Sequence, residues 1–172
     1  SQEKLENCIN SDLANNYGNL CQRVISFNEK NYNLKVPDNY KFNKDDQQIL
    51  DTYTSNIENL INSIDNQNVN YYVNFIQEQL FAANKYFNDQ EPWKKKSDKE
   101  RLNSILYVSL ELIRKISILL YPIIPESSIK ALKTFNITED KIDFNSIKNH
   151  EVLKVNSDIN KISILFKKIL QK

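Results

Sequence analysis

The feature that most constrains this fold is the segment from Ser97 to Leu120, which is apolar around most of its circumference. Its apolar side chains recur every three or four residues, the period of an α-helix. A surface helix needs only one apolar face, so a helix that is apolar on most sides must be covered by several neighbours. The segment therefore predicts a bundle around one central helix, and the Ser97-to-Glu100 spacing of a capping box predicts that this helix begins at Ser97.

The same helical period, confined to one face, recurs in flanking segments. We expect these helices over residues 5–27, 43–64, 72–87 and 125–135. Residues 136–157 form a long polar loop, and residues 159–169 show a weaker helical pattern. No segment of useful length has the sequence pattern of a β-strand. The prediction is an all-α bundle of about five to six helices, in a single domain over residues 1–172.

Scarcity of particular residue types excludes several kinds of site. The single glycine, Gly18, excludes glycine-rich phosphate-binding loops. The single histidine, His150, falls in a polar loop and cannot be grouped convincingly with the two cysteines as zinc ligands. The same scarcity leaves no plausible catalytic triad or Cys–His pair. We therefore expect neither catalytic residues nor a metal site in this chain.

Charge, cysteine placement and hydropathy describe the compartment and the partners. The chain has 23 basic and 22 acidic side chains, so any nucleic-acid binding must be local rather than driven by bulk charge. Cys8 and Cys21 are expected on one helix, roughly 20 Å apart at ~1.5 Å per residue, and cannot bridge each other. No signal peptide or membrane-length apolar run is seen. These features predict a cytoplasmic protein without a membrane or DNA partner.

A polar stripe runs beside the apolar face of the first predicted helix: Asn15, Asn19 and Arg23, each four residues from the last. Asparagine is a poor helix former, so the stripe costs helix stability without an evident structural return. An amide beside a guanidinium can match the Watson–Crick edge of an unpaired base, and of cytosine better than of uracil. On spacing alone, an ordinary exposed arginine with helical neighbours is the commoner explanation.

The connection before the central helix carries a second candidate surface. Trp93 is the only tryptophan, it follows Pro92, and it falls off any apolar stripe. An indole on a proline-stiffened loop can stack on an unpaired base. A tryptophan that plugs the end of the bundle is the alternative. Asn84, on the preceding helix, is a weaker candidate for the same surface. The basic side chains that follow are suited to phosphates: Lys94, Lys95, Lys96, Lys99 and Arg101.

These blocks together resemble the anticodon-binding domain of methionyl-tRNA synthetases, over roughly residues 10 to 135. The resemblance is carried by Asp12-Leu13-x-Asn15-x-x-x-Asn19-Leu20-x-x-Arg23, by Ala83-Asn84-x-Tyr86 with Pro92-Trp93, and by Leu106-Tyr107 and Leu119-Leu120-x-Pro122-x-x-Pro125. It implies the helical bundle of class I synthetases and a tRNA(Met) anticodon loop, CAU, as partner. It also implies that Asn19 and Arg23 read the cytosine, that Trp93 stacks on an anticodon base, and that Pro92 shapes the loop.

The resemblance also implies what lies outside these residues. The nucleotide-binding fold and the lysine-rich loop of the catalytic part are absent from the sequence, so we expect an excised C-terminal domain. ATP and zinc then belong to the missing N-terminal catalytic domain, which is a second expected partner. The terminal residues 164–169 resemble a tail that runs back in extended form, which opposes the helix predicted there. The equivalent domain of a sister synthetase (for isoleucine, leucine, valine or cysteine) and a helical protein-interaction module without RNA binding are the alternatives.

Overall fold

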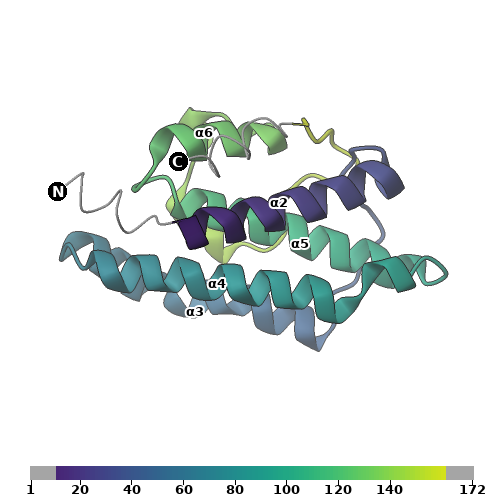
Figure 1. The fold of residues 1–172 in the computed structure, drawn as a ribbon, viewed down its shortest axis with the longest axis horizontal. Helices are drawn as coiled ribbons and strands as arrows, with labels where there is room; N and C mark the ends of the chain where they lie inside the picture. The colour runs from purple at the N-terminus through teal and green to yellow at the C-terminus, as the bar shows by residue number, and fades with distance from the viewer. Residues whose placement is uncertain (1–10, 162–172) are drawn as a thin grey trace.

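The computed structural model describes residues 11–161, and within them the chain forms helices and no strand (Figure 1). A single antiparallel bridge pairs Lys35 with Asp158. The α-helices are α2 (Ser11–Tyr32), α3 (Lys44–Asp65), α4 (Val69–Gln90), α5 (Lys99–Leu119) and α6 (Pro125–Leu132). The predicted all-α class and helix number are confirmed. The expectations for Leu5, Cys8 and residues 162–169 lie outside the described residues, whereas Cys21 is buried with a free thiol.

The central helix predicted from its apolar circumference is α5. Every residue from Leu102 to Leu119 is buried. The helices α2, α3, α4 and α6 all contact α5, with α3 and α4 below it and α6 above it in Figure 1. Buried side chains from all five helices form one continuous core. Polar bonds tie the layers together, for example the 2.5 Å hydrogen bond between the Tyr17 and Ser117 hydroxyls.

Several predicted helix ends differ from those of the structure by two to five residues: α4 extends beyond the predicted range 72–87 at both ends, and α6 ends at Leu132 rather than at residue 135. Helix α2 continues to Tyr32, although its apolar period fades after Phe27, because its inward-facing positions there are filled by the buried Asn28 and by Tyr32, which packs against the core. Asn28, predicted to begin the connection, is instead a buried helical residue whose amide donates to the Lys35 carbonyl at 2.9 Å. Helix α5 begins at Lys99, where the Asp98 carboxylate rather than Ser97 caps it by accepting from the Arg101 N–H. Asn43 caps α3, because its side chain accepts from the Asp46 N–H at 2.9 Å.

The polar loop after α6 forms short 3₁₀ turns rather than helices or strands: η2 (Lys133–Phe135), η3 (Glu139–Lys141) and η4 (Phe144–Lys148). We call residues 143–153 the C-terminal strap. Although its sequence is weakly patterned, it buries Ile147 and Leu153 against the bundle. The expected loop is confirmed, and it is better anchored than its sequence suggested.

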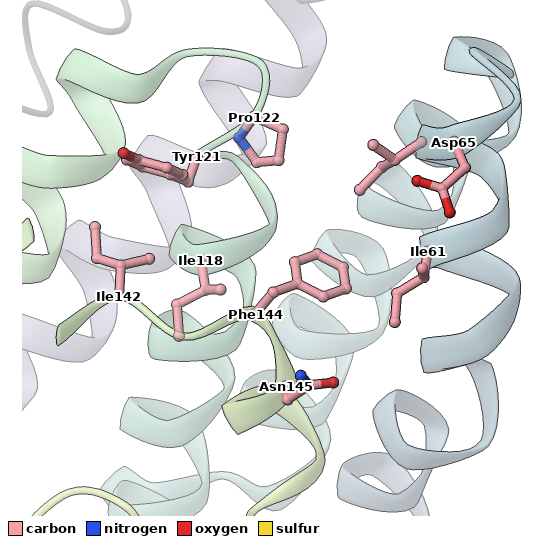
Figure 2. Close-up of a pocket in the computed structure, with 9 residues that line it drawn as sticks. Ile61, Asp65, Ile118, Tyr121, Pro122, Ile142, Phe144 and Asn145 are labelled. Atoms are coloured by element: carbon pink, nitrogen blue, oxygen red, sulfur yellow. The ribbon is translucent and has the colours of Figure 1, made fainter. Parts of the chain in front are cut away.

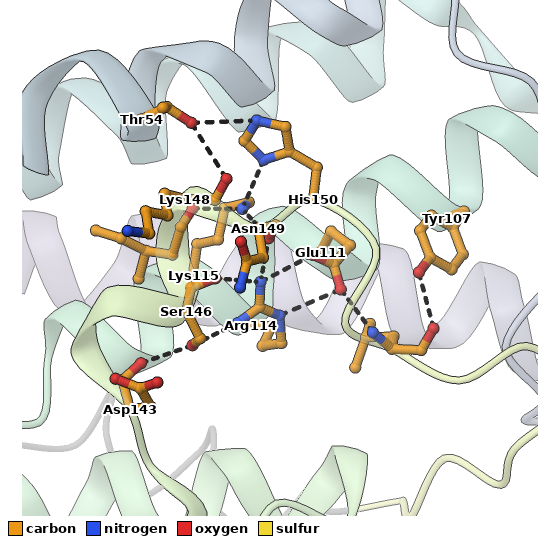
Figure 3. A network of polar contacts seen from close by, with 12 residues as sticks. Thr54, Tyr107, Glu111, Arg114, Lys115, Asp143, Ser146, Lys148, Asn149 and His150 are labelled. Atoms are coloured by element: carbon orange, nitrogen blue, oxygen red, sulfur yellow. Dashed lines mark hydrogen bonds and ion pairs between the residues drawn. The ribbon is translucent and has the colours of Figure 1, made fainter.

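Buried charges on α5 hold the C-terminal strap (Figure 3). Arg114 and Glu111 form an ion pair at 2.9 Å with both side chains fully buried. Arg114 also donates to the Ser146 and Asn149 carbonyls, and Glu111 accepts from the Leu153 N–H. A carboxylate and a guanidinium whose hydrogen bonds are met in this way are tolerated in a core. The pair therefore joins the central helix to the main chain of the strap.

Lys115 completes this network and its ammonium is also fully buried. Its Nζ lies 2.5 Å from the Ile147 carbonyl, 2.7 Å from the Asn149 carbonyl and 2.9 Å from His150 Nδ1. Burial, aided by the positive charge of Arg114, lowers the pKa of Lys115 to about 7. His150, predicted in a polar loop, is indeed there, but its ring is held by Lys115 and the Asp51 carboxylate.

No helix among residues 11–161 is long and apolar enough to cross a membrane.

Candidate nucleic-acid interface

The candidate site lies between α2 and α4, which pack side by side. Each helix presents residues at positions i, i+3 and i+7, the spacing of one helix face. On α2 these are Asn16, Asn19 and Arg23, and on α4 the corresponding positions are Phe81, Asn84 and Asn88. A hollow of about 250 Å³ opens between the two stripes, lined by Asn16, Asn19, Arg23, Phe81 and Asn84. It is smaller than the ~300–1,000 Å³ of a typical small-molecule pocket, which suits a single base.

Arg23 is held across the two helices by neutral groups. One Nη donates to Asn84 Oδ1 at 3.3 Å, and the other donates to Asn88 Oδ1. The guanidinium carbon lies 5.1 Å from the centre of the Phe87 ring, within cation–π distance. Asn84 is itself fixed, because its Nδ2 donates to the Leu80 carbonyl at 3.0 Å and lies 3.3 Å from the Asn16 carbonyl. The fork of donors on Arg23 is thereby oriented before any ligand arrives.

The three arginines of the chain differ in how their charge is compensated. Arg101 makes a bidentate ion pair with Asp46, both bonds 2.8 Å long, and Arg114 pairs with Glu111. Between residues 11 and 161, no carboxylate pairs with Arg23. A guanidinium bonded only to amides keeps its full positive charge for an outside acceptor. Arg23 is thus the arginine that is equipped to bind a ligand.

Trp93 continues the same surface. It lies in the 3₁₀ turn η1 (Pro92–Lys94) with 45 % of its surface exposed, whereas Pro92 is buried. The indole meets the Phe87 ring edge-on, with centroids 6.2 Å apart. Since Arg23 lies over that same ring, Arg23, Phe87 and Trp93 form one continuous row. The structure thus brings together four of the predicted site residues, Arg23, Asn84, Pro92 and Trp93, and Asn19 lines the adjoining hollow.

The backbone that carries Trp93 differs from the extended form expected before a proline. Glu91 has φ 47° and ψ 60°, the left-handed conformation that commonly ends an α-helix, whereas a residue before proline is usually extended. The Glu91 carboxylate pairs with Lys94 across the turn at 2.8 Å. Gln90, the last residue of α4, accepts a hydrogen bond from Arg101 at 3.0 Å. The turn is therefore held by the Glu91–Lys94 ion pair and by the Gln90–Arg101 hydrogen bond, and these interactions fix the position of the Trp93 side chain.

Arg101 is anchored in turn by Asp46, which is buried at the start of α3. Burial alone would raise the pKa of Asp46, but hydrogen bonds from Arg101 and Tyr86 hold that pKa below its ordinary value. Asp46 also accepts from the Asn43 N–H in the capping box of α3. These contacts join the start of α3, the start of α5 and the end of α4 next to the turn η1, which carries Trp93. Arg101 is consequently a structural residue and not one of the phosphate ligands expected from the basic cluster.

The remaining lysines of that cluster are used unequally. Lys94 is paired with Glu91, and the Lys99 ammonium lies 5.1 Å from the centre of the Tyr32 ring. Within the described part of the chain, the ammonium groups of Lys95 and Lys96 form no ion pair and contact no aromatic ring, although the charge of Lys95 also acts on the Glu91 carboxylate. These two lysines follow Trp93 closely and are the better candidates for phosphate contacts.

Two lining residues were not identified from the sequence. Asn16 lines the hollow, whereas Asn15, which was placed on the predicted stripe, is exposed and does not. The i, i+7 relation of Asn16 to Arg23 could have indicated this face. Phe81 falls within the helix predicted over residues 72–87, but it is 70 % exposed at the hollow rather than part of the apolar face. Its position beside Leu80, and outside the 76–80–83–87 stripe, is the signal that could have found it.

A second hollow, of about 380 Å³, lies between the end of α3, the α5–α6 connection and the start of the C-terminal strap (Figure 2). Its wall is mainly apolar, and the Phe144 ring projects between Ile118 and Ile61. It lacks an amide beside an arginine, so the α2–α4 face is the better candidate for reading a base. No group of three potential metal ligands is found among residues 11–161.

Comparison with known proteins gives a consistent result. A sequence family described as the anticodon binding domain of methionyl tRNA ligase matches residues 36–172, which include Asn84, Pro92 and Trp93 but not α2. Methionine–tRNA ligase of Brucella suis is 37 % identical over 145 residues, 84 % of this chain and 28 % of that protein. The Thermotoga maritima ligase is 32 % identical over 171 residues, 98 % of this chain and 27 % of that protein, so this alignment includes α2.

Solved structures agree with the sequence relatives. The Mycobacterium tuberculosis methionyl-tRNA synthetase in complex with methionyl-adenylate superimposes with a TM-score of 0.82 at 30 % identity, covering 95 % of this chain and 33 % of that one. Its free form superimposes with a TM-score of 0.79 at 32 % identity, covering 88 % and 31 %. The chain therefore spans about a third of these structures and 27–28 % of the curated relatives.

Proposed function

The chain belongs to the family of anticodon-binding domains of methionyl-tRNA ligases, and on this premise we propose that its α2–α4 face binds the anticodon loop of tRNA(Met). The observation that carries the proposal is the charge of Arg23, which is oriented by amides and not neutralised by a carboxylate among the described residues. In this proposal Asn19 and Arg23 read the first anticodon base of CAU, a cytosine.

The chemistry of the two side chains suits cytosine. Its Watson–Crick edge offers one amino donor beside two acceptors. The Asn19 carbonyl oxygen can accept from the amino group, while Arg23 donates to the acceptors. Uracil replaces the amino donor with a carbonyl and the ring acceptor with an N–H, so polar groups of the site would be left unpaired. Discrimination of about 1–3 kcal/mol is expected by analogy with bidentate base contacts elsewhere.

The other predicted residues support this contact. Trp93 offers an exposed ring face on which a neighbouring base can stack, and the buried Pro92 keeps that ring in place. Asn84 acts as a positioning residue, since it holds the guanidinium of Arg23. In this proposal Lys95 and Lys96, which follow Trp93 closely, contact the phosphates beside those bases.

The curated relatives are methionine–tRNA ligases of which this chain matches little more than a quarter. We therefore propose that the parent enzyme activates methionine with ATP and transfers it to tRNA. The binding of ATP belongs in this proposal to a catalytic domain beyond these residues, and the present domain selects the tRNA and packs against that catalytic domain. Catalysis is not assigned to any residue of this chain.

Titration with RNA tests the proposal directly. The 172-residue chain is mixed with an anticodon stem-loop carrying CAU, or with one whose cytosine is changed to uracil, and binding is followed by the anisotropy of a fluorescein label on the RNA. We expect the CAU loop to bind about 5- to 150-fold more tightly, the equivalent of ~1–3 kcal/mol. Preference for uracil would overturn the assignment of Asn19 and Arg23. Binding of neither loop would favour a protein-interaction module instead.

The sister synthetases are separated by a different measurement. The full-length enzyme is supplied with each candidate tRNA and its amino acid, and the charged product is quantified. Charging of tRNA(Met) with methionine is the expected outcome. Charging of an isoleucine, leucine, valine or cysteine tRNA would contradict the proposal, whatever the domain binds in isolation.

A further inference from the structure

Phe81 is the most exposed large apolar side chain among the described residues. Its ring is 70 % accessible to solvent, while the neighbouring Leu80 is completely buried in the core. A phenylalanine so exposed contributes little to folding, because the apolar area that it removes from water is small. Scattered apolar side chains on a surface need no explanation, but Phe81 borders the hollow that also contains Asn19 and Arg23.

The hollow combines the two kinds of contact that an unpaired base requires. A base is held through its face by an aromatic ring and through its edge by hydrogen bonds. Phe81 supplies an accessible ring, and Asn19 and Arg23 supply the polar groups of the same hollow. Among residues 11–161, the Asn19 amide has no hydrogen-bond partner, so its donors and acceptor are available.

Trp93 does not provide a face to this hollow. It is not among the lining residues, and the Phe87 ring lies between it and Arg23. The surface therefore has two separate exposed rings, Phe81 at the hollow and Trp93 against Phe87 beyond the end of α4. Two rings that are separated in this way are suited to two different bases.

We infer that Phe81 is a second stacking platform, which holds the base whose edge Asn19 and Arg23 read, while Trp93 stacks on another base of the same loop. The inference rests on the proposed function, because it names a further residue of the same RNA-binding surface. Phe81 is thereby a specificity residue: it fixes the plane of the base, and a base fixed in that plane can meet Asn19 and Arg23 only with a matching edge.

Variants of Phe81 test whether its ring stacks. The CAU stem-loop is titrated into the 172-residue chain with Phe81→Ala, Phe81→Leu or Phe81→Tyr, again by anisotropy of the labelled RNA. Loss of stacking is expected to weaken binding about 5- to 100-fold in the alanine variant. Leucine keeps the apolar volume without a ring and should bind nearly as weakly as alanine. Tyrosine keeps the ring and should bind within about twofold of the unchanged protein.

Tyr71 provides the matched control, because it is another exposed aromatic residue of α4, ten positions earlier and about 15 Å away at ~1.5 Å per residue. Tyr71→Ala should leave RNA binding unchanged. The circular dichroism melting curves of the Phe81 variants should match that of the unchanged protein, since the ring is mostly in solvent. Equal weakening by Tyr71→Ala would overturn the inference, because the effect would then not be specific to the hollow.

A loop without the first anticodon base identifies which base Phe81 holds. In a stem-loop with an abasic nucleotide at that position, Phe81→Ala should cause no further loss of affinity, whereas Trp93→Ala should still weaken binding. An undiminished effect of Phe81→Ala on the abasic loop would show that the ring contacts another nucleotide and overturn the assignment. Normal binding of the CAU loop by Phe81→Ala would overturn the inference and leave the proposed function standing. Failure of the unchanged protein to bind the CAU loop would overturn both.

Discussion

Arg23 and Arg114 are the same residue type, but they differ in burial and in how their charge is compensated. Arg114 is completely buried on α5, and its charge is balanced by the equally buried Glu111. Arg23 lies at the surface between α2 and α4, where the described residues offer it only amide oxygens and an aromatic face. The difference teaches how to separate structural from functional arginines in this bundle. A guanidinium with a carboxylate partner holds the fold, and one that is positioned without being neutralised is available to a ligand.

The largest effect that this comparison predicts comes from Arg114→Met. The change leaves the Glu111 carboxylate buried without its partner, which should lower the free energy of unfolding by about 3–5 kcal/mol. Urea titration followed by circular dichroism measures it. Replacing both partners, with Glu111→Leu added, should recover much of the loss, because no lone buried charge remains. A single variant as stable as the unchanged protein would show that the pair does not hold the strap.

Arg23→Met should show the converse behaviour. Stability is expected to stay within about 1 kcal/mol, while affinity for the CAU stem-loop falls by about 1.5–3 kcal/mol, the usual worth of a hydrogen bond to a charged group. Arg23→Lys should not restore affinity, since an ammonium lacks the planar fork of donors.

In the full-length enzyme, Arg23→Met or Trp93→Ala should lower aminoacylation and leave methionine-dependent ATP–pyrophosphate exchange unchanged. An equal fall in exchange would refute a role in reading tRNA.

The free energy of unfolding should also depend on pH, because Lys115 is buried on α5 beside Arg114. Its pKa is about 7 in the folded chain and ~10.4 when unfolded, so between these values the unfolded state binds more protons. Stability should therefore rise with pH, with a slope approaching ~1.4 kcal/mol per unit. Urea titrations between about pH 7 and about pH 8 keep most cysteine thiols of the unfolded chain protonated, because their pKa is ~8.5 and their ionisation opposes the trend at higher pH. Lys115→Met should flatten the slope, and an unchanged slope would mean that another group causes it.

The smallest effect concerns the lysines after Trp93. Lys95→Gln and Lys96→Gln should each reduce the salt dependence of RNA binding, by about 0.7 in the slope of log K against log salt for each phosphate that the lysine no longer neutralises. Lys94→Gln is the control, because Glu91 already offsets its charge. The same slope change in all three variants would mean that the Glu91 pair does not remove Lys94 from RNA binding.

Most of the fold followed from apolar periodicity, because a packed helix must repeat its apolar face every turn. The central position of α5 was predictable for this reason. Arg23 and Trp93 were selected by other signals, the asparagine-rich stripe of the first helix and the position of Trp93 off any apolar stripe, and their role in binding stays a prediction. Exact helix ends were less predictable, since neighbouring residues can each cap the same helix terminus. Asp98 is adjacent to Ser97, and the side chain of either residue can cap the N-terminus of α5.

The parts that the sequence did not reveal depend on contacts between distant segments. Glu111, Arg114 and Lys115 interrupt an otherwise apolar helix, which could have indicated buried and paired charges, but their partners come from the main chain more than thirty residues later. Phe81 looked like a core residue because its helix is rich in apolar positions. Only the packing of α4 against α2 decides that this ring faces the hollow.

The C-terminal strap is held largely through its main chain: α5 contacts the carbonyls of Ser146, Ile147 and Asn149 and the N–H of Leu153. Every amino acid, proline included, offers a carbonyl oxygen, so the grip does not depend on which residue stands at an exposed position such as 149. The exposed side chains of this strap are therefore free to drift in evolution, whereas the three charges on α5 are not. A family member could be recognised by its retained charges even after its strap had changed beyond alignment.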